Sequence, residues 1–563
     1  MLHARLTLDP GFAVGEVDPR LFGSFVEHMG RCVYTGVYEP GHPTADEDGF
    51  RADVLDLVRE LGVTVVRYPG GNFVSGYRWE DGVGPRGERP SRFDLAWRQI
   101  ETNEFGLNEF MAWSRKTGVA PMMAVNLGTR GVREAADLVE YCNFPGGTAL
   151  SDLRAKHGQP EPHGISLWCL GNELDGPWLT GHKTAHEYGR LANETAKAMR
   201  MVDPSIELVA CGSSNSGMPT FGSWEATVLE HTYDNVDYVS LHAYYEEHDG
   251  DLGSFLASAV DMDRFIDAVV ATCDHVGAKL RNRKQIRLSF DEWNVWYMNR
   301  FVGEKNLAAE RVPRLIEDNY HVADAVVVGS LLITLLRHAD RVGVACQAQL
   351  VNVIAPILTE PGGGSCRQII FFPFAHAARH ARGRVLRVEP DSPRYDTARF
   401  GDVPLLEAVA TQNGNEVVLF AVNRSVEDSL GLTANVRALP GLSVVEHVVL
   451  ASDDRSLTNT VAEPDRVLPR RVDGASVVDG ELTAELPALS WNMIRLSSRG
   501  QPRRGRKNAR MSATRSSGRS RAAKWPPRGN SVKRWRLYAR STHERGGVKL
   551  SLAKEAKPVG TDT

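Results

Sequence analysis

The chain has 563 residues, of which 42% are hydrophobic and 24% charged, a composition typical of a globular protein too long for one ordinary core. Its net charge of −4 conceals two unlike parts: residues 499–563 hold 19 Lys and Arg against 3 Asp and Glu, whereas the first 498 residues hold 47 against 67. Such an acidic body argues against nucleic acid or an anionic membrane as a partner.

The N-terminus and the apolar runs predict a protein that is not exported. The opening stretch, MLHARLTLDPGF, lacks the apolar core of a signal peptide. The strongest apolar run, residues 325–336, is too short to span a bilayer comfortably and predicts a buried helix. Seven scattered cysteines without a CxxC pair indicate buried thiols, with neither disulfides nor zinc. We therefore expect a cytoplasmic protein.

Eight strand-like runs alternate with amphipathic, helix-like segments in the first two thirds of the chain. The runs cover residues 21–28, 64–71, 120–128, 164–173, 207–214, 238–244, 286–293 and 342–350. Continuous apolar strands that alternate with helices predict a (β/α)₈ TIM barrel over residues 19–383. A doubly wound parallel sheet is the alternative, but no GxGxxG motif opens the first unit.

From residue 384 the pattern changes to short alternating stretches such as NEVVLFAVNR, separated by Gly, Asp, Asn and Pro turns. This pattern predicts an all-β, jelly-roll-like sandwich over residues 384–497, and the alternating residues 1–18 are expected to add a strand to it. Residues 498–563 are rich in Arg, Ser and Gly and are expected to be disordered. Aromatic residues between the arginines leave two readings open, a nucleic-acid-binding tail or an extension without function.

Polar residues stand at the ends of the predicted barrel strands, where the active site of such a barrel forms. They are Glu27, Arg67 with Asn72, Asn126, Asn172 with Glu173, Ser213, His242 with Tyr244, Glu292 and Gln349. Glu173 and Glu292 each follow a fully apolar strand, the fourth and the seventh, so they can face each other across the mouth. Glycosidic cleavage needs such a pair, one acid to protonate the departing oxygen and one carboxylate to attack the anomeric carbon or guide water. The alternative is that each glutamate caps a helix or pairs with an arginine.

The neighbouring residues also have two interpretations each. Arg67 could be a structural ion-pair partner, or could keep the nucleophile ionised. His242 and Tyr244 could bond Glu292 or a sugar hydroxyl, or belong to the rim of the core. Trp296 could stack on a sugar or fix its loop. The strand-end candidates lack the HxxxH or HxH spacing of a metal-ligand pair, so we expect no metal site there.

Five longer motifs, WCLGNELDGPW, FDEWNVWY, RYPGGNFVSGY, YCNFPGG and AQLVNVIAPILTE, resemble the α-L-arabinofuranosidases of glycoside hydrolase family 51 (clan A). The resemblance runs from about residue 4 to residue 497. It implies a (β/α)₈ barrel, a C-terminal β-sandwich and a retaining, two-step mechanism, with Glu173 as the general acid/base and Glu292 as the nucleophile. It also implies that arabinose or the catalytic pair is contacted by Glu27, Arg67, Asn72, Asn172, His242, Tyr244, Trp296 and Gln349.

The expected function is that of a retaining, exo-acting enzyme that hydrolyses terminal non-reducing α-L-arabinofuranosyl residues from arabino-oligosaccharides. Two alternatives stay open: another retaining clan A glycosidase, such as a β-glycosidase or an endo-glucanase, or a non-catalytic carbohydrate-binding protein. A retaining enzyme predicts a carboxyl separation of about 5–5.5 Å. The resemblance further implies a homo-oligomer, often a hexamer, that needs no metal or cofactor.

Overall fold

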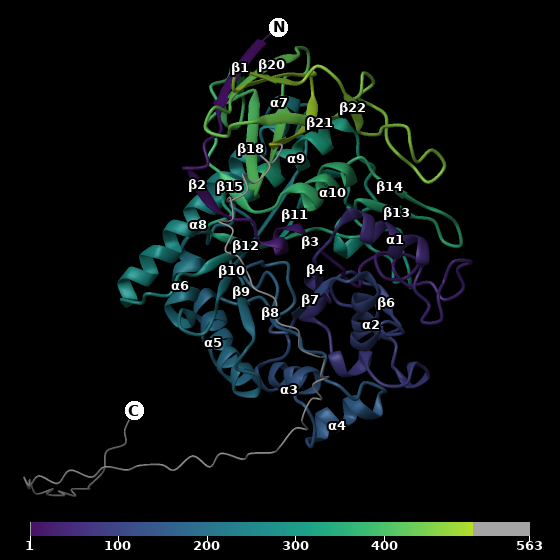
Figure 1. The fold of residues 1–563 in the computed structure, drawn as a ribbon. Helices are drawn as coiled ribbons and strands as arrows, with labels where there is room; N and C mark the ends of the chain where they lie inside the picture. The colour runs from purple at the N-terminus through teal and green to yellow at the C-terminus, as the bar shows by residue number, and fades with distance from the viewer. Residues whose placement is uncertain (1, 499–563) are drawn as a thin grey trace, which may run out of the picture. The chain divides into compact units, whose positions relative to one another are not determined.

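The computed structural model describes residues 2–498, which contain a closed barrel of eight strands (Figure 1). Neighbouring barrel strands run parallel to each other. The strands are β3 (Gly23–Phe25), β4 (Val65–Tyr68), β7 (Ala120–Ala124), β8 (Leu167–Leu170), β9 (Glu207–Ala210), β10 (Tyr238–Tyr245), β11 (Arg287–Val295) and β12 (Val342–Gln347). Each overlaps one of the eight predicted strand runs, so the barrel prediction is confirmed.

Helices lie on the outside of the barrel. They are α1 (Ala52–Leu61), α2 (Leu107–Thr117), α3 (Val132–Asn143), α4 (Ala149–Lys156), α5 (Ala185–Val202), α6 (Ser223–Thr232), α7 (Leu252–Leu256), α8 (Ala259–Leu280), α9 (Val322–Arg337) and α10 (Phe371–His380). Local sequence fixes their ends. The Thr184 side chain accepts the backbone N–H of Glu187, and Glu187 accepts that of Thr184, which starts α5 with a capping box.

The interior of the barrel is filled by side chains and is not an open channel. Small and medium apolar groups from different strands pack there, among them Val65, Met122, Leu167, Val209 and Val344. Packing of this kind is typical of an eight-stranded barrel, whose interior is just wide enough for side chains to fill it. The polar residues are consequently placed beyond this layer, toward the ends of the strands.

Two sheets, each with one strand from the N-terminal segment and the others from the chain after the barrel, pack face to face. One has the strand order β2-β15-β18-β19-β25-β21-β22 and the other β1-β20-β24-β23. Their bounds are β1 (Leu2–Thr7), β2 (Ala13–Glu16), β15 (Arg384–Leu386), β18 (Leu406–Asn413), β19 (Glu416–Asn423), β20 (Leu430–Asn435), β21 (Leu442–Leu450), β22 (Arg470–Val472), β23 (Ser476–Val478), β24 (Glu481–Leu486) and β25 (Ser490–Ser498). A separate apolar core lies between the sheets, so the predicted sandwich is confirmed. The division into domains at residues 18 and 383 stays our proposal.

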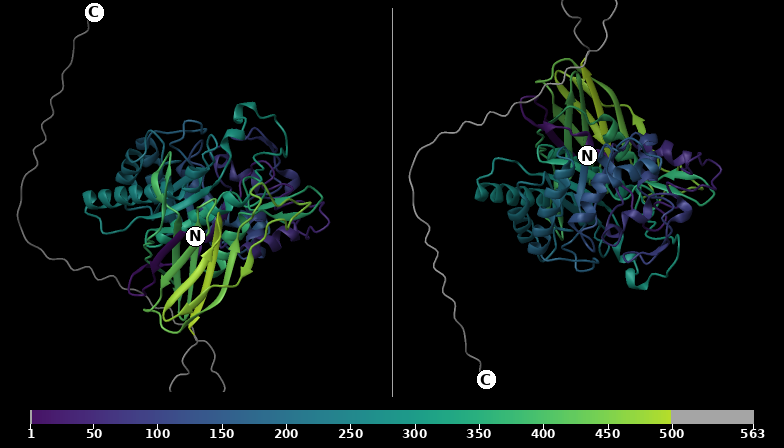
Figure 2. Two further views of the ribbon diagram at one scale, coloured as in Figure 1. Left: turned by 90° about the horizontal axis from the view of Figure 1, so that it is seen from above. Right: turned by 90° about the horizontal axis from the view of Figure 1, so that it is seen from below.

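Helices α9 and α10 lie between the seven-stranded sheet and the barrel strands (Figures 1 and 2). Helix α9 is buried from Val322 to Leu336, as its apolar run predicts. Its residue Gly329 allows a close approach to Trp491 of β25, because a Cβ atom at position 329 would lie 2.3 Å from the indole ring. The barrel with its helices and the seven-stranded sheet therefore share one continuous apolar core.

Shorter elements lie in the connections. They are η1 (Pro19–Phe22), η2 (Asn72–Ser75), η3 (Trp79–Gly82), η4 (Arg86–Glu88), η5 (Met298–Arg300), η6 (Glu304–Asn306) and the hairpins β5–β6 (Arg92–Phe93, Ile100–Glu101), β13–β14 (Ile357–Thr359, Ser365–Arg367) and β16–β17 (Arg394–Thr397, Gly401–Pro404). None of the helices within residues 2–498 combines the length and the apolarity needed to cross a membrane. The two predictions made for the tail, disorder and nucleic-acid binding, concern residues outside the described range.

Candidate active site

Glu173 and Glu292 reach the mouth of the barrel from different local structures. Glu292 lies within β11, and its Cα pairs with that of His242 on β10. Glu173 follows the end of β8 and has a φ of 45°, in the left-handed region that non-glycine residues seldom adopt. Strain of this kind persists where the surrounding structure holds a residue in place, and it concentrates at functional sites.

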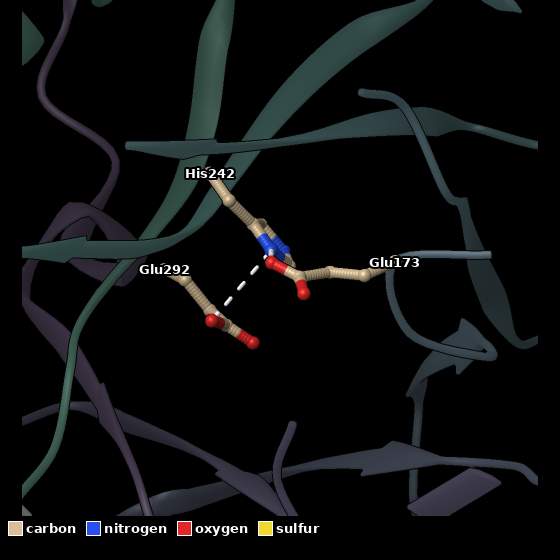
Figure 3. A group of neighbouring side chains, drawn as sticks. All are labelled: Glu173, His242 and Glu292. Carbon is tan, nitrogen blue, oxygen red and sulfur yellow. Dashed lines mark hydrogen bonds and ion pairs between the residues drawn. The ribbon is translucent and has the colours of Figure 1, made fainter. Parts of the chain in front are cut away.

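The two carboxylates converge from different strands, and the ring of His242 lies beside both of them (Figure 3). One oxygen of Glu173, one oxygen of Glu292 and one ring nitrogen of His242 all lie within 4.8 Å of one another. The two glutamates are 9% and 5% exposed, so they are largely shielded but still open to the cavity. An oxygen-to-oxygen gap this short favours the close carboxyl pair of retaining glycosidases over the roughly 6.5–9.5 Å carboxyl separation of inverting ones.

Glu292 is held by two donors, one for each carboxylate oxygen. Arg67 donates from Nη1 to Oε1 at 2.7 Å, and the Tyr244 hydroxyl donates to Oε2 at 2.8 Å. Arg67 is itself oriented by a second bond, from Nη2 to Oδ1 of Asn172 at 2.6 Å. The amide of Asn172 then donates to Oδ1 of Asn72 at 3.0 Å. This buried chain fixes the nucleophile candidate in position and places the positive charge of Arg67 beside it.

Glu173 has a different environment. Burial raises the pKa of its carboxyl, the hydrogen bond from His242 opposes that rise, and the charge of Glu292 adds to it. The bond joins His242 Nδ1 to Glu173 Oε1 at 2.8 Å, and Trp178 donates from Nε1 to Oε2 at 3.3 Å. A carboxyl with a raised pKa can remain protonated at a pH where an ordinary glutamate has ionised.

His242 links Glu173 to Asp291, the residue that precedes Glu292. Its Nε2 lies 3.0 Å from Oδ1 of Asp291, and its Nδ1 faces Glu173. Burial disfavours the charged ring, but Glu292, Asp291 and Glu173 outweigh that effect and raise the pKa of His242 to about 10. A protonated ring that donates to a carboxyl oxygen on either side explains both short contacts.

Glu27 and Gln349 form a second polar group in the cavity. The Glu27 carboxylate accepts the backbone N–H of Phe73 at 2.9 Å, the indole N–H of Trp97 at 2.8 Å and the Gln349 amide at 3.0 Å. Burial nevertheless raises the pKa of Glu27 to about 8, with Glu292 adding to the rise. The Gln349 oxygen has no protein partner among the described residues, so it is free to accept a ligand hydroxyl.

A cavity of about 540 Å³ joins these groups. Of the ten predicted site residues, seven line it: Glu27, Asn72, Glu173, Tyr244, Glu292, Trp296 and Gln349. The other three, Arg67, Asn172 and His242, lie directly behind that lining and contact it through the bonds above. Two other polar strand-end residues lie outside the lining. Asn126 bonds the Tyr77 carbonyl, and the Ser213 backbone N–H bonds Glu225.

Two residues of the site were not singled out from the sequence. Asp291 stands inside an apolar strand, and only its place beside Glu292 could have drawn attention to it. It accepts from His242 and from Ser289, and it lies 3.9 Å from Arg67 Nε. Trp178 is 48% exposed and occupies the loop after β8, where the local sequence does not indicate that it contacts Glu173.

Glu173, His242 and Glu292 also have the atom types of a metal site. Both ring nitrogens of His242 already face carboxylate oxygens at hydrogen-bonding distance, so a protonated ring has no lone pair left for a cation. Arg67 and Tyr244 likewise occupy one oxygen each of Glu292. The donor set fits a proton-transfer site better than a metal site.

Comparison with known proteins gives a consistent result along the chain. The family model described as α-L-arabinofuranosidase 1 domain matches residues 57–253, and the α-L-arabinofuranosidase C-terminal domain model matches residues 291–490. The chain is 65% identical over 510 residues to an intracellular exo-α-(1→5)-L-arabinofuranosidase of Streptomyces lividans, covering 90% of this chain and 77% of that protein. It is 55% identical over 498 residues to intracellular exo-α-(1→5)-L-arabinofuranosidase 1 of Bacillus subtilis, covering 88% and 99%.

A solved structure agrees with these matches. The family 51 α-L-arabinofuranosidase AbfB from Bifidobacterium longum superimposes with a TM-score of 0.85 at 49% sequence identity, covering 88% of this chain and all of that one. The fold, the two matching domain models and the full-length identity all point to one family. The chain belongs to the α-L-arabinofuranosidases of glycoside hydrolase family 51.

Proposed function

We propose that this chain is a retaining, exo-acting α-L-arabinofuranosidase that releases terminal non-reducing α-L-arabinofuranosyl residues from arabino-oligosaccharides. The observation that carries the proposal is the close approach of the Glu173 and Glu292 carboxylates, with oxygens within 4.8 Å, at the mouth of the barrel. The relatives' names, which describe intracellular exo-arabinofuranosidases, supply the substrate class and support an intracellular location.

In the first step Glu292 attacks the anomeric carbon of the arabinofuranosyl group. A bond forms between a Glu292 oxygen and that carbon, and the bond to the leaving oxygen breaks. The Glu173 proton passes to that oxygen, so the aglycone departs as a neutral alcohol. Arg67 and Tyr244 support the attacking carboxylate, since each donates to one of its oxygens.

In the second step the roles of Glu173 reverse. Esterification of Glu292 removes the negative charge that helps to raise the pKa of Glu173, so Glu173 is more readily ionised. It then accepts a proton from water as the water oxygen attacks the anomeric carbon, and the ester bond to Glu292 breaks. Arabinose leaves with its anomeric configuration retained, and Glu173 is protonated again.

The remaining predicted residues are proposed to bind the sugar. Glu27, Asn72 and Gln349 offer hydrogen-bonding groups to the hydroxyls of a furanose ring, and Trp296 packs edge to face against Tyr244 with ring centroids 5.2 Å apart. Buried polar groups of this kind discriminate strongly against a ligand that leaves them unpaired. The resemblance-based expectation of a homo-oligomer, often a hexamer, remains a proposal.

Two rival functions predict different behaviour. Another clan A glycosidase would use the same glutamates but prefer a pyranoside, and a carbohydrate-binding protein would turn over no glycoside. The raised pKa of Glu173 and the two donors that hold Glu292 support catalysis over binding alone.

The test is a set of initial rates with aryl α-L-arabinofuranoside, β-D-xyloside and β-D-glucoside on the wild type and on Glu292→Ala. We expect turnover of the arabinofuranoside alone and its loss in the variant, by a factor on the order of 10⁴ or more because the covalent step is removed. Preference for a pyranoside would contradict the substrate class. Full activity of Glu292→Ala would contradict the assigned nucleophile.

A further inference from the structure

One side of the catalytic cavity is lined by residues other than the ten predicted site residues. Residues 214–217 after β9, Tyr245 at the end of β10, and Asp261 on α8 form part of its wall. The sugar-binding candidates Glu27, Asn72 and Gln349 come instead from the loops after β3, β4 and β12. In the closed order β10-β11-β12-β3-β4-β7-β8-β9, these two groups of loops occupy different arcs of the barrel mouth.

The acid/base candidate indicates which side receives the leaving group. Glu173 follows β8, which is a direct neighbour of β9 in the barrel. Because Glu173 gives its proton to the departing oxygen, the aglycone must pass beside this residue. The wall formed after β9 and β10 is therefore the natural place for the part of the substrate that departs.

One residue of this wall comes from outside the barrel. Arg399 lies in the turn of the β16–β17 hairpin, which connects the sandwich strands β15 and β18, and it lines the same cavity as Glu173 and Glu292. Its guanidinium carbon lies 5.5 Å from the centroid of the Phe400 ring, which supports the side chain from one side. No carboxylate among the described residues forms an ion pair with it.

The hairpin is fixed in place by bonds to helix α7. The Tyr395 hydroxyl donates to the Gly253 carbonyl at 3.0 Å, and the backbone N–H of Arg399 donates to Oγ of Ser254 at 3.2 Å. From the sandwich, buried Arg424 donates from Nε to the Leu256 carbonyl at 3.0 Å. Helix α7 is thus attached at both ends, so the backbone of Arg399 has a defined position at the cavity edge.

The same wall also offers an acceptor. Asp261 accepts the Ser216 hydroxyl at 3.0 Å and the Tyr245 hydroxyl at 3.1 Å, which orients its carboxylate. An arginine donor and an oriented carboxylate within one cavity match the hydroxyl groups of a neutral sugar chain, each of which can both donate and accept. Their opposite charges disfavour a strongly anionic or cationic ligand.

We propose that Arg399 is a specificity-determining residue that binds the leaving-group portion of an oligosaccharide, beyond the sugar directly attached to the scissile bond. This inference rests on the proposed function and adds the role of the β16–β17 hairpin to it. The preferred substrates are then neutral oligosaccharides of at least three sugar residues. On this proposal an aryl glycoside, whose leaving group is short, makes no contact with Arg399.

The test compares kcat/KM for α-(1→5)-linked arabinotriose with kcat/KM for an aryl α-L-arabinofuranoside in the full chain. In Arg399→Ala we expect the ratio of the two values to fall about tenfold, mainly through a higher KM for the triose, as the loss of a hydrogen bond to a charged group predicts. Arg399→Lys should recover part of the ratio. Arg394→Ala is the matched control, because Arg394 lies on the same hairpin, pairs with Asp402 and does not line the cavity.

Two results would overturn the inference. An unchanged ratio in Arg399→Ala would show that Arg399 does not bind the leaving group. An equal drop for both substrates, with the same drop in Arg394→Ala, would show that the hairpin acts only through folding. Failure of the wild type to hydrolyse the aryl arabinofuranoside would refute the proposed function itself, so the two failures are distinguishable.

Discussion

Glu173 and Glu292 are the same amino acid in one cavity, and their neighbours divide the two roles. Glu292 accepts from an arginine and a tyrosine, which fix both of its oxygens. Glu173 is buried beside that negative charge, which favours its protonated form. The two glutamates therefore differ in their hydrogen-bond partners although their nearest oxygens lie within 4.8 Å of each other.

Substitution of Glu173 tests this division at the residue scale. In Glu173→Ala we expect kcat/KM for arabino-oligosaccharides to fall by about 10²–10⁴, because a sugar alcohol leaves poorly without a proton. An aryl substrate with a good leaving group should still form the glycosyl-enzyme, seen as a burst of aryl product followed by slow turnover.

The dependence of kcat/KM on pH is a second test of the acid/base role of Glu173. A protonated acid is lost as pH rises through its pKa, so wild-type kcat/KM for oligosaccharides should fall on the alkaline side at the raised pKa of Glu173. That alkaline limb should be absent in Glu173→Ala with the aryl substrate. Equal losses for good and poor leaving groups would contradict the acid/base role.

Sequence reasoning found the strand-end residues because a barrel places all strand ends at one rim. It did not find Asp291, which lies within an apolar strand and acts through His242 and Arg67 rather than through the cavity. It did not find Arg399 either, since that residue reaches the site through packing of a distant hairpin on α7. Local patterns contain no information on contacts of this tertiary kind.

At the scale of elements, helix α9 joins the barrel to the seven-stranded sheet. Its uniformly apolar sequence predicted a buried helix, but the contact with β25 depends on one glycine. The Trp491 ring is 1% exposed and packs against His376 and Phe420, so it has little room to move away from α9. The interface is thus determined by side-chain volume as much as by apolar character.

Gly329→Ala tests that close contact. In an exposed helix this change would stabilise by up to about 1 kcal/mol, because glycine is a poor helix former. Here the added Cβ would lie 2.3 Å from Trp491 Cδ1, so overpacking of about 1–3 kcal/mol should dominate and lower the thermal unfolding midpoint. The control is Ser330→Ala on the same helix, whose buried hydroxyl has no partner among the described residues. A Gly329→Ala protein as stable as the wild type would refute the account.

At the scale of the whole molecule, residues 2–498 contain all ten predicted site residues and the apolar cores of the barrel and the sandwich. The last described strand, β25, lies between β19 and β21 and is hydrogen-bonded to both. Its residues Ile494 and Leu496 belong to the core between the two sheets, and Trp491 belongs to the core shared with the barrel. The fold therefore needs the chain as far as Ser498.

Removal of residues 499–563 should leave arabinofuranosidase activity and the thermal midpoint unchanged, since the residues that form the site and the apolar cores all lie within residues 2–498. A cut after Pro487 is the contrasting variant: it deletes β25 and should prevent folding.

The full chain and the chain without residues 499–563 can also be compared on a heparin column. With 16 more basic than acidic groups in residues 499–563, we expect salt-sensitive retention that is lost on removal of the segment. Retention on heparin together with unchanged activity would show that the segment contributes only its charge. A fall in activity or in melting temperature on removal of the segment would show that it supports the enzyme directly.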